Sequence, residues 1–178
     1  SLPLPQKNMT VKEYLISELK HEAAGTRKML ERVPFEQASW QPHELSRSMV
    51  ETAQHVAQIP LWVERITNHD TFDFATGFSA PSQVQNVDEL LALHDKSVES
   101  AISALEHIPD ADLEQPWTMM RGEHTVASLP KATAIRNMAA NHLVHHRGQR
   151  SVYLRLQNIP VPGMYGPSAD DKKKMAAS

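Results

Sequence analysis

Hydrophobic and polar residues follow a helical period in four long stretches of the chain. Prolines separate these stretches, which span residues 6–33, 43–80, 82–108 and 131–159. Within them, apolar residues recur every three or four positions, and this spacing places them on one face of an α-helix. The pattern therefore predicts four amphipathic helices whose apolar faces pack into one core.

The residues that flank the first and third stretches carry helix-start signals. Thr10 and, three positions later, Glu13 form a capping box, in which each side chain accepts a hydrogen bond from the backbone N–H of the other residue. Asn86 is the N-cap residue expected for the third helix, and acidic residues follow it where the helix dipole favours negative charge. Both signals agree with the periodicity.

Prolines define the shape of the second and fourth stretches. Pro60 lies inside the second stretch and lacks the N–H for a helical hydrogen bond, so we expect a kink in that helix without a break. Ser128 and Pro130 mark the start of the fourth helix, and the sequence Asn-Ile-Pro-Val-Pro-Gly at 158–163 marks its end. The fourth stretch is thus predicted to be one helix of about seven turns.

The connections between the helices give little sign of a sheet. Two longer ones span residues 68–85 and 110–129, and the second contains Pro-Trp-Thr-Met-Met, which can form a short extended piece. No alternation of strands and helices is present. The sequence predicts an all-α fold, a four-helix bundle in a single domain of 178 residues with its core at about 9–160. We expect the charged C-terminal tail to be frayed.

Composition excludes several kinds of site. The chain has no cysteine, so a metal site must use nitrogen and oxygen ligands, and disulfides and thiolate nucleophiles are excluded. The formal net charge is −3 and there is no basic stripe, which disfavours nucleic-acid binding. No run approaches the roughly 18 apolar residues that a membrane span needs. We expect a soluble cytoplasmic protein without nucleic-acid or membrane partners.

The sequence NHLVHHRGQR at 141–150 is the richest source of candidate chemistry. His142 and His146 are four positions apart, so on a helix their rings lie on one face and can reach the same ion. His145 points elsewhere. Two ligands do not close a metal site, and a solvated helix face rich in histidine is the alternative interpretation, so a third ligand is needed.

Among the other histidines, His55 differs because of its neighbours. Ile59 and Trp62 lie on its helix face, which is therefore too apolar to be plainly exposed to solvent. A neutral core histidine is the alternative interpretation. The remaining histidines are expected at the surface or on polar helix faces: His21, His43, His69, His94, His107 and His124.

Four motifs occur in a particular order along the chain. They are Trp40-x-Pro42, SMVETAQHVAQIPLWV, HLVHHRGQRSVYLRL and NIPVPGMYGPSAD. In this combination, the chain from about Met9 to Asp170 resembles the DinB/YfiT-like family of metal-dependent proteins. The resemblance implies a four-helix bundle in up-down-down-up order, often dimeric.

The same resemblance implies a metal site. In the family, one histidine of the second helix and two of the fourth hold a divalent ion, and these positions match His55, His142 and His146. The family's His-Arg-Gly-Gln run is intact from His146 to Gln149. Resemblance and helix-face spacing therefore select the same three residues.

Three neutral imidazoles leave a divalent ion its full charge and an open position for water or substrate. Such an ion can lower the pKa of a bound water, polarise a carbonyl or activate a thiol. We expect Zn²⁺ or Ni²⁺, with iron, manganese and cobalt as alternatives that also accept imidazole. The resemblance implies a thiol transferase acting with a low-molecular-weight thiol as one option, and hydrolase-like chemistry is the other.

Residues near the three histidines have more than one interpretation. Gln149 can hold a water or substrate, or form a hydrogen bond to another helix. For Arg147, a salt bridge to an acidic neighbour is the favoured interpretation, and binding of an anionic substrate is the alternative. Glu51 can orient the nearby imidazole or face water, and Gly148 suggests a close approach by another helix or by the site itself. Trp62 and the connection that follows its helix can wall a pocket.

Other metal sites fit the sequence poorly. A di-iron bundle needs Glu-x-x-His pairs on two helices and a zincin needs H-E-x-x-H, and neither motif is present. The main alternative is a non-enzymatic, stress-associated bundle that binds metal or ligand without turnover. A structural metal would have a fourth protein ligand such as Asp or Glu, whereas catalysis requires an open position. An apolar stripe left outside the core would serve the homodimer that the resemblance implies.

Overall fold

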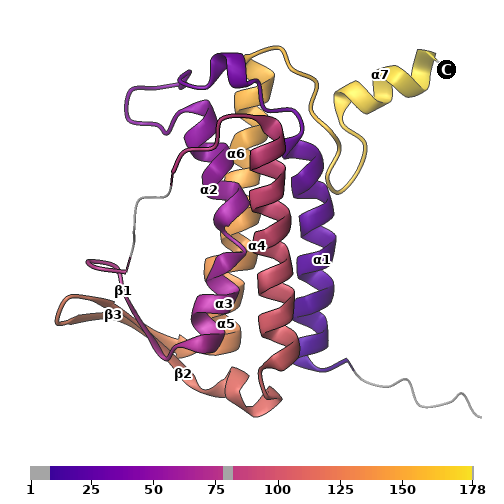
Figure 1. Cartoon of the computed structure of the whole chain (residues 1–178). Coiled ribbons are helices and arrows are strands. Elements are labelled where there is room, and N and C mark those ends of the chain that lie inside the picture. Colours follow the sequence, from indigo (N-terminus) through magenta and orange to yellow (C-terminus); the bar gives the residue numbers. More distant parts are fainter. Residues whose placement is uncertain (1–8, 78–81, 178) are drawn as a thin grey trace, which may run out of the picture.

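Helices make up most of the fold, which the computed structural model describes for residues 9–77 and 82–177. The long helices lie side by side along one common direction (Figure 1). They are α1 (Val11–Leu30), α2 (Met49–Gln58) followed by α3 (Leu61–Asn68), α4 (Val87–His107) and α6 (His142–Leu156). Helix α4 packs against α1, α2 and α3, and α6 packs against α1 and α2. Two short 3₁₀ turns, η1 (Phe35–Gln37) and η2 (Asp110–Glu114), lie in the connections.

The predicted helix caps are confirmed. The Thr10 hydroxyl accepts a hydrogen bond from the Glu13 N–H at 3.1 Å, and the Glu13 carboxylate accepts one from the Thr10 N–H at 2.8 Å. The Asn86 side chain accepts from the Glu89 N–H at 2.9 Å at the start of α4. Each cap satisfies N–H groups that have no partner inside the helix.

The buried apolar residues form two adjoining clusters along the helices. One includes Leu19, Trp62, Ile66, Leu105 and Trp117. The other includes Leu30, Met49, Val56, Leu90 and Leu143. Since α3 contributes to the first cluster and α2 to the second, this pair of helices is packed along its whole length and gives its side chains a rigid base.

Pro60 interrupts the second helix, where the sequence predicts a kink without a break. Helix α2 ends at Gln58 and α3 begins at Leu61, but Ile59 and Pro60 keep right-handed helical backbone angles. The N–H groups of Trp62 and Val63 bond to carbonyls three residues back, at 3.0 Å each, because the proline removes one donor from the regular ladder. The chain therefore continues in a helical course across the interruption.

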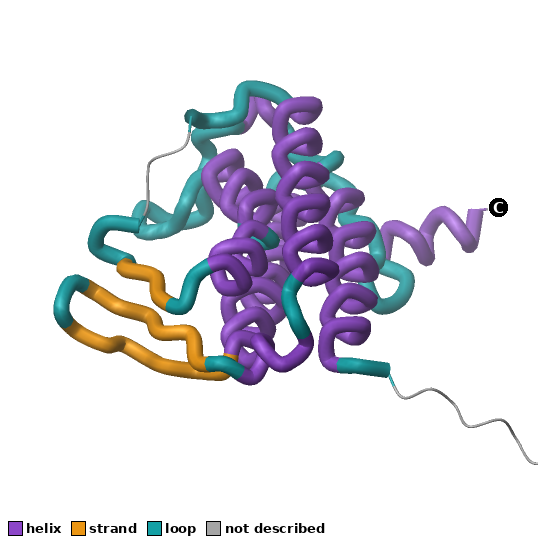
Figure 2. Tube along the Cα trace, turned by 60° about the horizontal axis from the view of Figure 1, so that its bottom comes forward, coloured by secondary structure: helices purple, strands orange, loops and turns teal. Residues whose placement is uncertain are grey.

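The all-α prediction is wrong for the two long connections. They contribute a three-stranded sheet in the order β1 (Thr71–Asp73), β2 (Pro116–Arg121) and β3 (His124–Pro130). Strand β1 is parallel to β2, and β2 is antiparallel to β3. The sheet stands beside one end of the helices (Figure 2).

A tight turn and one buried side chain explain why the sheet forms. Gly122, at a positive φ of 59°, lets the chain reverse between β2 and β3. Trp117 of β2 is only 1% exposed, and its ring meets that of Trp62 edge-on at 6.3 Å between centroids. The sequence Pro-Trp-Thr-Met-Met is therefore extended, as expected, but it pairs with neighbours that the sequence pattern did not identify.

The fourth predicted helix is divided into three parts. Helix α5 (Lys131–Ile135) leads into a π-helical turn, η3 (Arg136–Asn141), and α6 begins directly after it. Ser128 lies in β3 and so is not part of the helix start, while Pro130 precedes the first helical residue as predicted. A π-helical turn inside a helix is uncommon and often lies at a functional site.

The C-terminal tail is not frayed, contrary to expectation. Residues Ala169–Ala177 form helix α7. Its first turn is held by the Asp170 carboxylate, which pairs with Arg155 of α6 at 2.5 Å and accepts the Val161 N–H at 2.9 Å. These contacts connect the tail to the end of α6.

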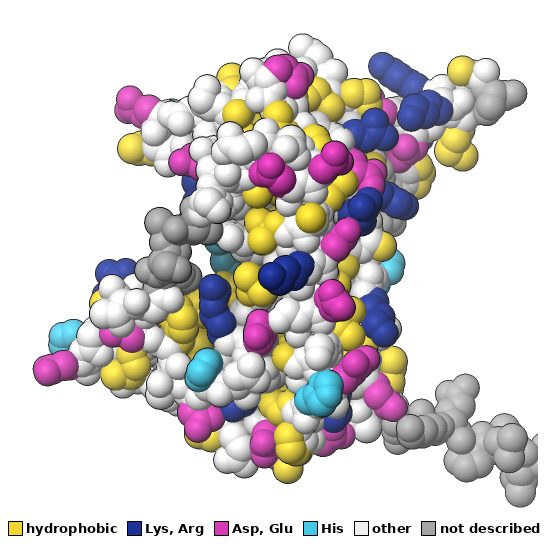
Figure 3. All heavy atoms as spheres, viewed as in Figure 1, with side chains coloured by type: hydrophobic (Ala, Val, Ile, Leu, Met, Phe, Trp, Pro, Cys, Tyr) yellow, Lys and Arg dark blue, Asp and Glu magenta, His cyan; other side chains and the backbone are white. Residues whose placement is uncertain are grey.

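The surface carries charges of both signs. On the face shown in Figure 3, acidic and basic side chains are interspersed over the helices. None of the helices in the described ranges combines the length and apolar character that crossing a membrane requires.

Candidate metal centre

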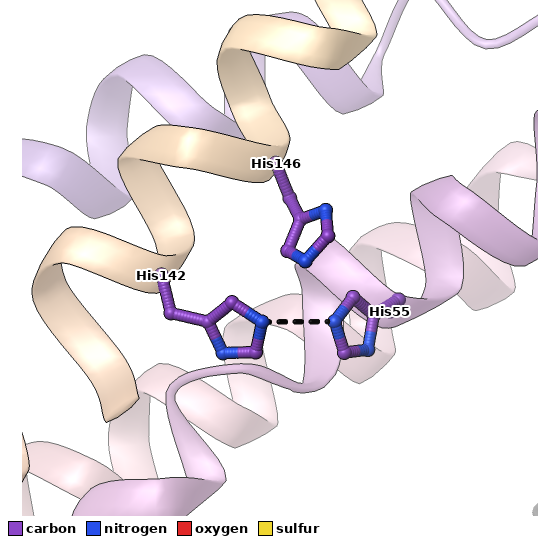
Figure 4. A group of neighbouring side chains, drawn as sticks. All are labelled: His55, His142 and His146. Carbon is purple, nitrogen blue, oxygen red and sulfur yellow. Dashed lines mark hydrogen bonds between the residues drawn. The ribbon is translucent and has the colours of Figure 1, made fainter. Parts of the chain in front are cut away.

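Three histidine side chains converge between α2 and α6. His55 extends from α2, while His142 and His146 extend from successive turns of α6, and the three rings point toward a common centre (Figure 4). One nitrogen of each ring lies within 4.8 Å of those of the other two. The structure thus brings together the three residues that the sequence predicts as metal ligands.

The closest nitrogens have the separation that a small ion requires. His55 Nε2 and His142 Nε2 are 3.3 Å apart. Two nitrogens bound to a tetrahedral zinc ion at about 2.0–2.1 Å lie about 3.3–3.4 Å from each other. The distance between these two rings therefore fits an ion that binds both of them.

Hydrogen bonds fix the orientation of the two α6 imidazoles. His142 Nδ1 donates to the Met138 carbonyl at 3.2 Å, and His146 Nδ1 donates to Gln149 Oε1 at 2.7 Å. Because each Nδ1 carries the proton, each Nε2 has its lone pair available to a metal. Met138 lies in the π-helical turn, so this turn supplies the carbonyl that holds His142.

Burial keeps the imidazoles neutral, which is the form that binds metal. The pKa of His55 is lowered to about 3, first by burial and then by the positive charges of Arg47 and the other two imidazoles. Burial likewise lowers the pKa of His142 and of His146. Near neutral pH, protons therefore do not compete with a metal for these nitrogens.

The three histidines line a pocket of about 850 Å³. Its walls include the predicted Trp62, together with Phe74 from the following connection and Gln149. Residues 78–81 of that connection, including Phe78, lie outside the described residues. No Asp or Glu is among the described residues that line the pocket, and the residues outside the described ranges carry no acidic side chain.

Comparison with known proteins identifies the family. The model of the DinB family matches residues 6–175. The chain belongs to the DinB family. Its fold is similar to that of a DinB-like protein (YjoA) from Bacillus subtilis, with a TM-score of 0.64, 18% sequence identity, and coverage of 83% of this chain and 96% of the other.

A second solved structure agrees with this DinB-family fold. A DinB-like protein from Bacillus cereus has a TM-score of 0.64 and 22% identity, and the match covers 86% of this chain and 97% of that one. At such identities the likeness concerns the fold. No protein of curated function matches the sequence.

The other histidines of this DinB-family chain do not join the centre. Within residues 9–77 and 82–177, the three-histidine group does not include His145, which is exposed on α6. His94 was expected on a polar helix face but is buried in α4 at 1% exposure, beside Asp95. Its burial lowers its pKa, although the Asp95 carboxylate acts in the opposite direction.

The sequence left the roles of four neighbouring residues open, and the structure shows the surroundings of each. Gln149 orients His146, a role that the sequence did not predict, and Arg147 forms the buried salt bridge expected of it, with Glu22 of α1. Glu51 caps α2 by accepting the Ser48 N–H at 2.8 Å and does not orient His55. The close approach expected at Gly148 is not observed, because no described atom outside its two chain neighbours and the backbone of its own helix lies within 4 Å of the position of a Cβ there.

Sequence reasoning missed two arginines of the pocket. Arg47 and Arg65 both line it, one before α2 and the other in α3. In the sequence they lie on either side of His55, which is in α2. No sequence signal marks them, because arginines at surface positions are common.

Proposed function

We propose that this DinB-family protein binds a divalent metal ion through His55, His142 and His146 and uses it as an enzyme acting on a small molecule. One observation carries the proposal: three neutral imidazoles converge on the wall of a pocket that has no lining carboxylate among the described residues. This donor set leaves a position open toward the pocket, as in catalytic zinc sites.

The donor set also limits the ion and the chemistry. Imidazole nitrogen suits Zn²⁺ and Ni²⁺, which are our preferred ions, and it accepts iron, manganese and cobalt as well. When bound, such an ion supplies a Lewis acid that acidifies a neighbouring water or thiol. We therefore propose thiol-transferase or hydrolase-like chemistry, and in the first case a low-molecular-weight thiol is the co-substrate.

The second candidate is a non-enzymatic protein that binds metal or ligand without turnover. A purely structural metal would be closed by a fourth protein ligand, such as Asp or Glu from a neighbouring loop. The lack of a carboxylate on the described lining of the pocket favours the enzyme over this alternative.

We further propose that the long helices form a four-helix bundle in up-down-down-up order. The course of the ribbon supports this order, since α1 and α6 run one way and the α2–α3 pair and α4 run the other way (Figure 1). The order places α2 beside α6, which is the contact that brings His55 to the other two histidines.

Elemental analysis of the protein purified without an affinity tag tests the metal. We expect about one divalent ion per chain in the wild type, and loss of that ion in His55→Ala and in His142→Ala. His145→Ala is the matched control, because His145 lies in the same run of histidines but outside the cluster, and it should keep the ion. Equal metal content in all four proteins would overturn the assignment.

A further inference from the structure

The charged residues that line the pocket have one sign. Arg47 and Arg65 contribute guanidinium groups, and no described Asp or Glu lines the pocket. A divalent ion at the three histidines would add to the positive charge. In a cleft with low-dielectric walls, charges of one sign attract a ligand of the opposite sign.

Arg47 is the cation that acts most directly on the histidine cluster. Its charge lowers the pKa of His55, of His142 and of His146, so its field reaches all three imidazoles. Arg47 is exposed, and none of the described residues forms an ion pair with it. Its guanidinium is therefore available to a ligand beside the metal position.

The carboxylates nearest in sequence to the two arginines are held by other groups. Glu51 accepts the Ser48 N–H at the start of α2, at 2.8 Å. Glu64 accepts the hydroxyl of Ser100 on α4, at 2.5 Å. The hydrogen bonds with Ser48 lower the pKa of Glu51 most, and the Arg47 charge lowers it further. Burial lowers the pKa of Arg65, while Glu64 acts to raise it. Neither carboxylate lines the pocket, so both charges on the described lining are positive.

The other part of the pocket is aromatic. Trp62 and Phe74 both line it, and their rings are stacked with centroids 5.6 Å apart and an angle of 22° between planes. The Arg65 guanidinium lies 5.0 Å from the Trp62 ring centre. Because Trp62 is seven residues after His55 across Pro60, this wall lies about two helical turns from the imidazole.

We propose that the pocket takes a small organic anion, with its acidic group at Arg47 and an apolar part along Trp62 and Phe74. The inference rests on the proposed function in one respect, because the reacting atom of the bound molecule would lie over the three histidines that separate the two subsites. Arg65 adds positive potential at the aromatic end. An anion bound in this way would extend from Arg47 across the three histidines to Trp62 and Phe74.

Calorimetric titration with 8-phenyloctanoate and its neutral amide, 8-phenyloctanamide, tests the inference, because their chain is long enough to cross the two helical turns between the imidazole and Trp62. We expect the acid to bind the metal-loaded protein about tenfold more tightly than the amide, since a hydrogen bond to a charged group contributes about that factor. Arg47→Gln should remove most of this preference and leave the affinity for the amide unchanged. Phe74→Ala should weaken both probes to a similar extent.

Two controls make the outcome decisive. Arg32→Gln replaces an exposed arginine that does not line the pocket, and it should keep the full preference for the acid. The same titrations on metal-free protein separate the contribution of Arg47 to acid binding from that of the ion, which can itself attract a carboxylate. A preference that survives in Arg47→Gln, or that disappears when only the metal is removed, would overturn the proposal.

The anion site and the metal site can fail independently. Metal content measured on Arg47→Gln should equal that of the wild type, because the variant changes none of the three histidines. If the wild type lacks metal but still prefers the acid through Arg47, the metal proposal fails and the anion site stands. If metal is bound and both probes bind equally, the metal proposal stands and the anion site fails.

Discussion

His55 and His142 face each other across the contact between α2 and α6, with their Nε2 atoms 3.3 Å apart and their ring planes at 68°. The His142 Nδ1 proton is directed to the Met138 carbonyl, so His142 can only accept at Nε2. The His55 ring either donates to that nitrogen or shares an ion with it. The second arrangement explains why His146 also points to the same place.

Gln149 holds His146 in the orientation that a metal needs, and its removal should weaken metal binding. We expect Gln149→Ala to lower the metal affinity about tenfold, at the low end of the effect of losing such an orienting partner. Competition with a chromogenic chelator measures this affinity. Gln83→Ala, at an exposed site outside the pocket, should leave it unchanged, and an unchanged affinity in Gln149→Ala would show that the hydrogen bond has no orienting role.

Arg147 and Arg150 are both buried on α6 but should differ in their effect on stability. Arg147 pairs with Glu22 and donates to the Tyr165 hydroxyl at 2.7 Å, so Arg147→Met leaves a buried carboxylate without its cation. We expect that change to lower the free energy of unfolding by about 3 kcal/mol.

Arg150 has no acidic partner among the described residues, and burial lowers its pKa to about 10. Its Nε and Nη2 atoms have no hydrogen-bond partner there either. Arg150→Met should therefore change the free energy of unfolding by no more than about 1 kcal/mol, or increase it. Urea denaturation of both variants measures the difference, and equal losses would contradict this assignment of roles.

His94 should make the protein less stable in acid. Its pKa is lowered by burial, while Asp95 raises it and Arg27 lowers it further, and its Nε2 has no partner among the described residues. Because the folded-state pKa lies below the ordinary value of 6.5, the unfolded chain binds more protons there. The stabilising effect of neutral His94 is complete above pH 6.5 and is lost as the pH falls through the lowered pKa.

The variant His94→Leu tests that pH dependence. Urea denaturation of metal-loaded protein at several pH values between 7.5 and about 5 should show a smaller loss of stability for the variant than for the wild type. His107→Leu, at an exposed site at the end of the same helix, should follow the wild type. Identical curves for His94→Leu and the wild type would rule out this origin of acid sensitivity.

The sequence predicted the helices and the pair of His142 and His146 because both depend on local spacing. The capping residues and apolar periodicity act within a few turns of chain, and His142 and His146 are on one helix face for the same reason. His55 was added by its apolar neighbours and by the family resemblance. The distance between His55 and the other two histidines is set by the packing of α2 on α6, which the sequence alone does not reveal.

The features that the sequence did not predict arise from contacts between distant segments. Strand β1 pairs with β2 although the whole of α4 lies between them in the sequence, and such pairing leaves no local period in the sequence. The π-helical turn before His142 replaces regular helix without a proline or glycine to mark it. Arg47 and Arg65 became pocket residues only through the fold.

A crystal structure of the zinc-loaded protein, with anomalous scattering recorded at the zinc edge, tests the central claim most directly. We expect one strong peak about 2.0–2.1 Å from Nε2 of each of His55, His142 and His146, with the fourth position open to the pocket. A peak elsewhere, or a fourth ligand supplied by a protein carboxylate, would contradict it.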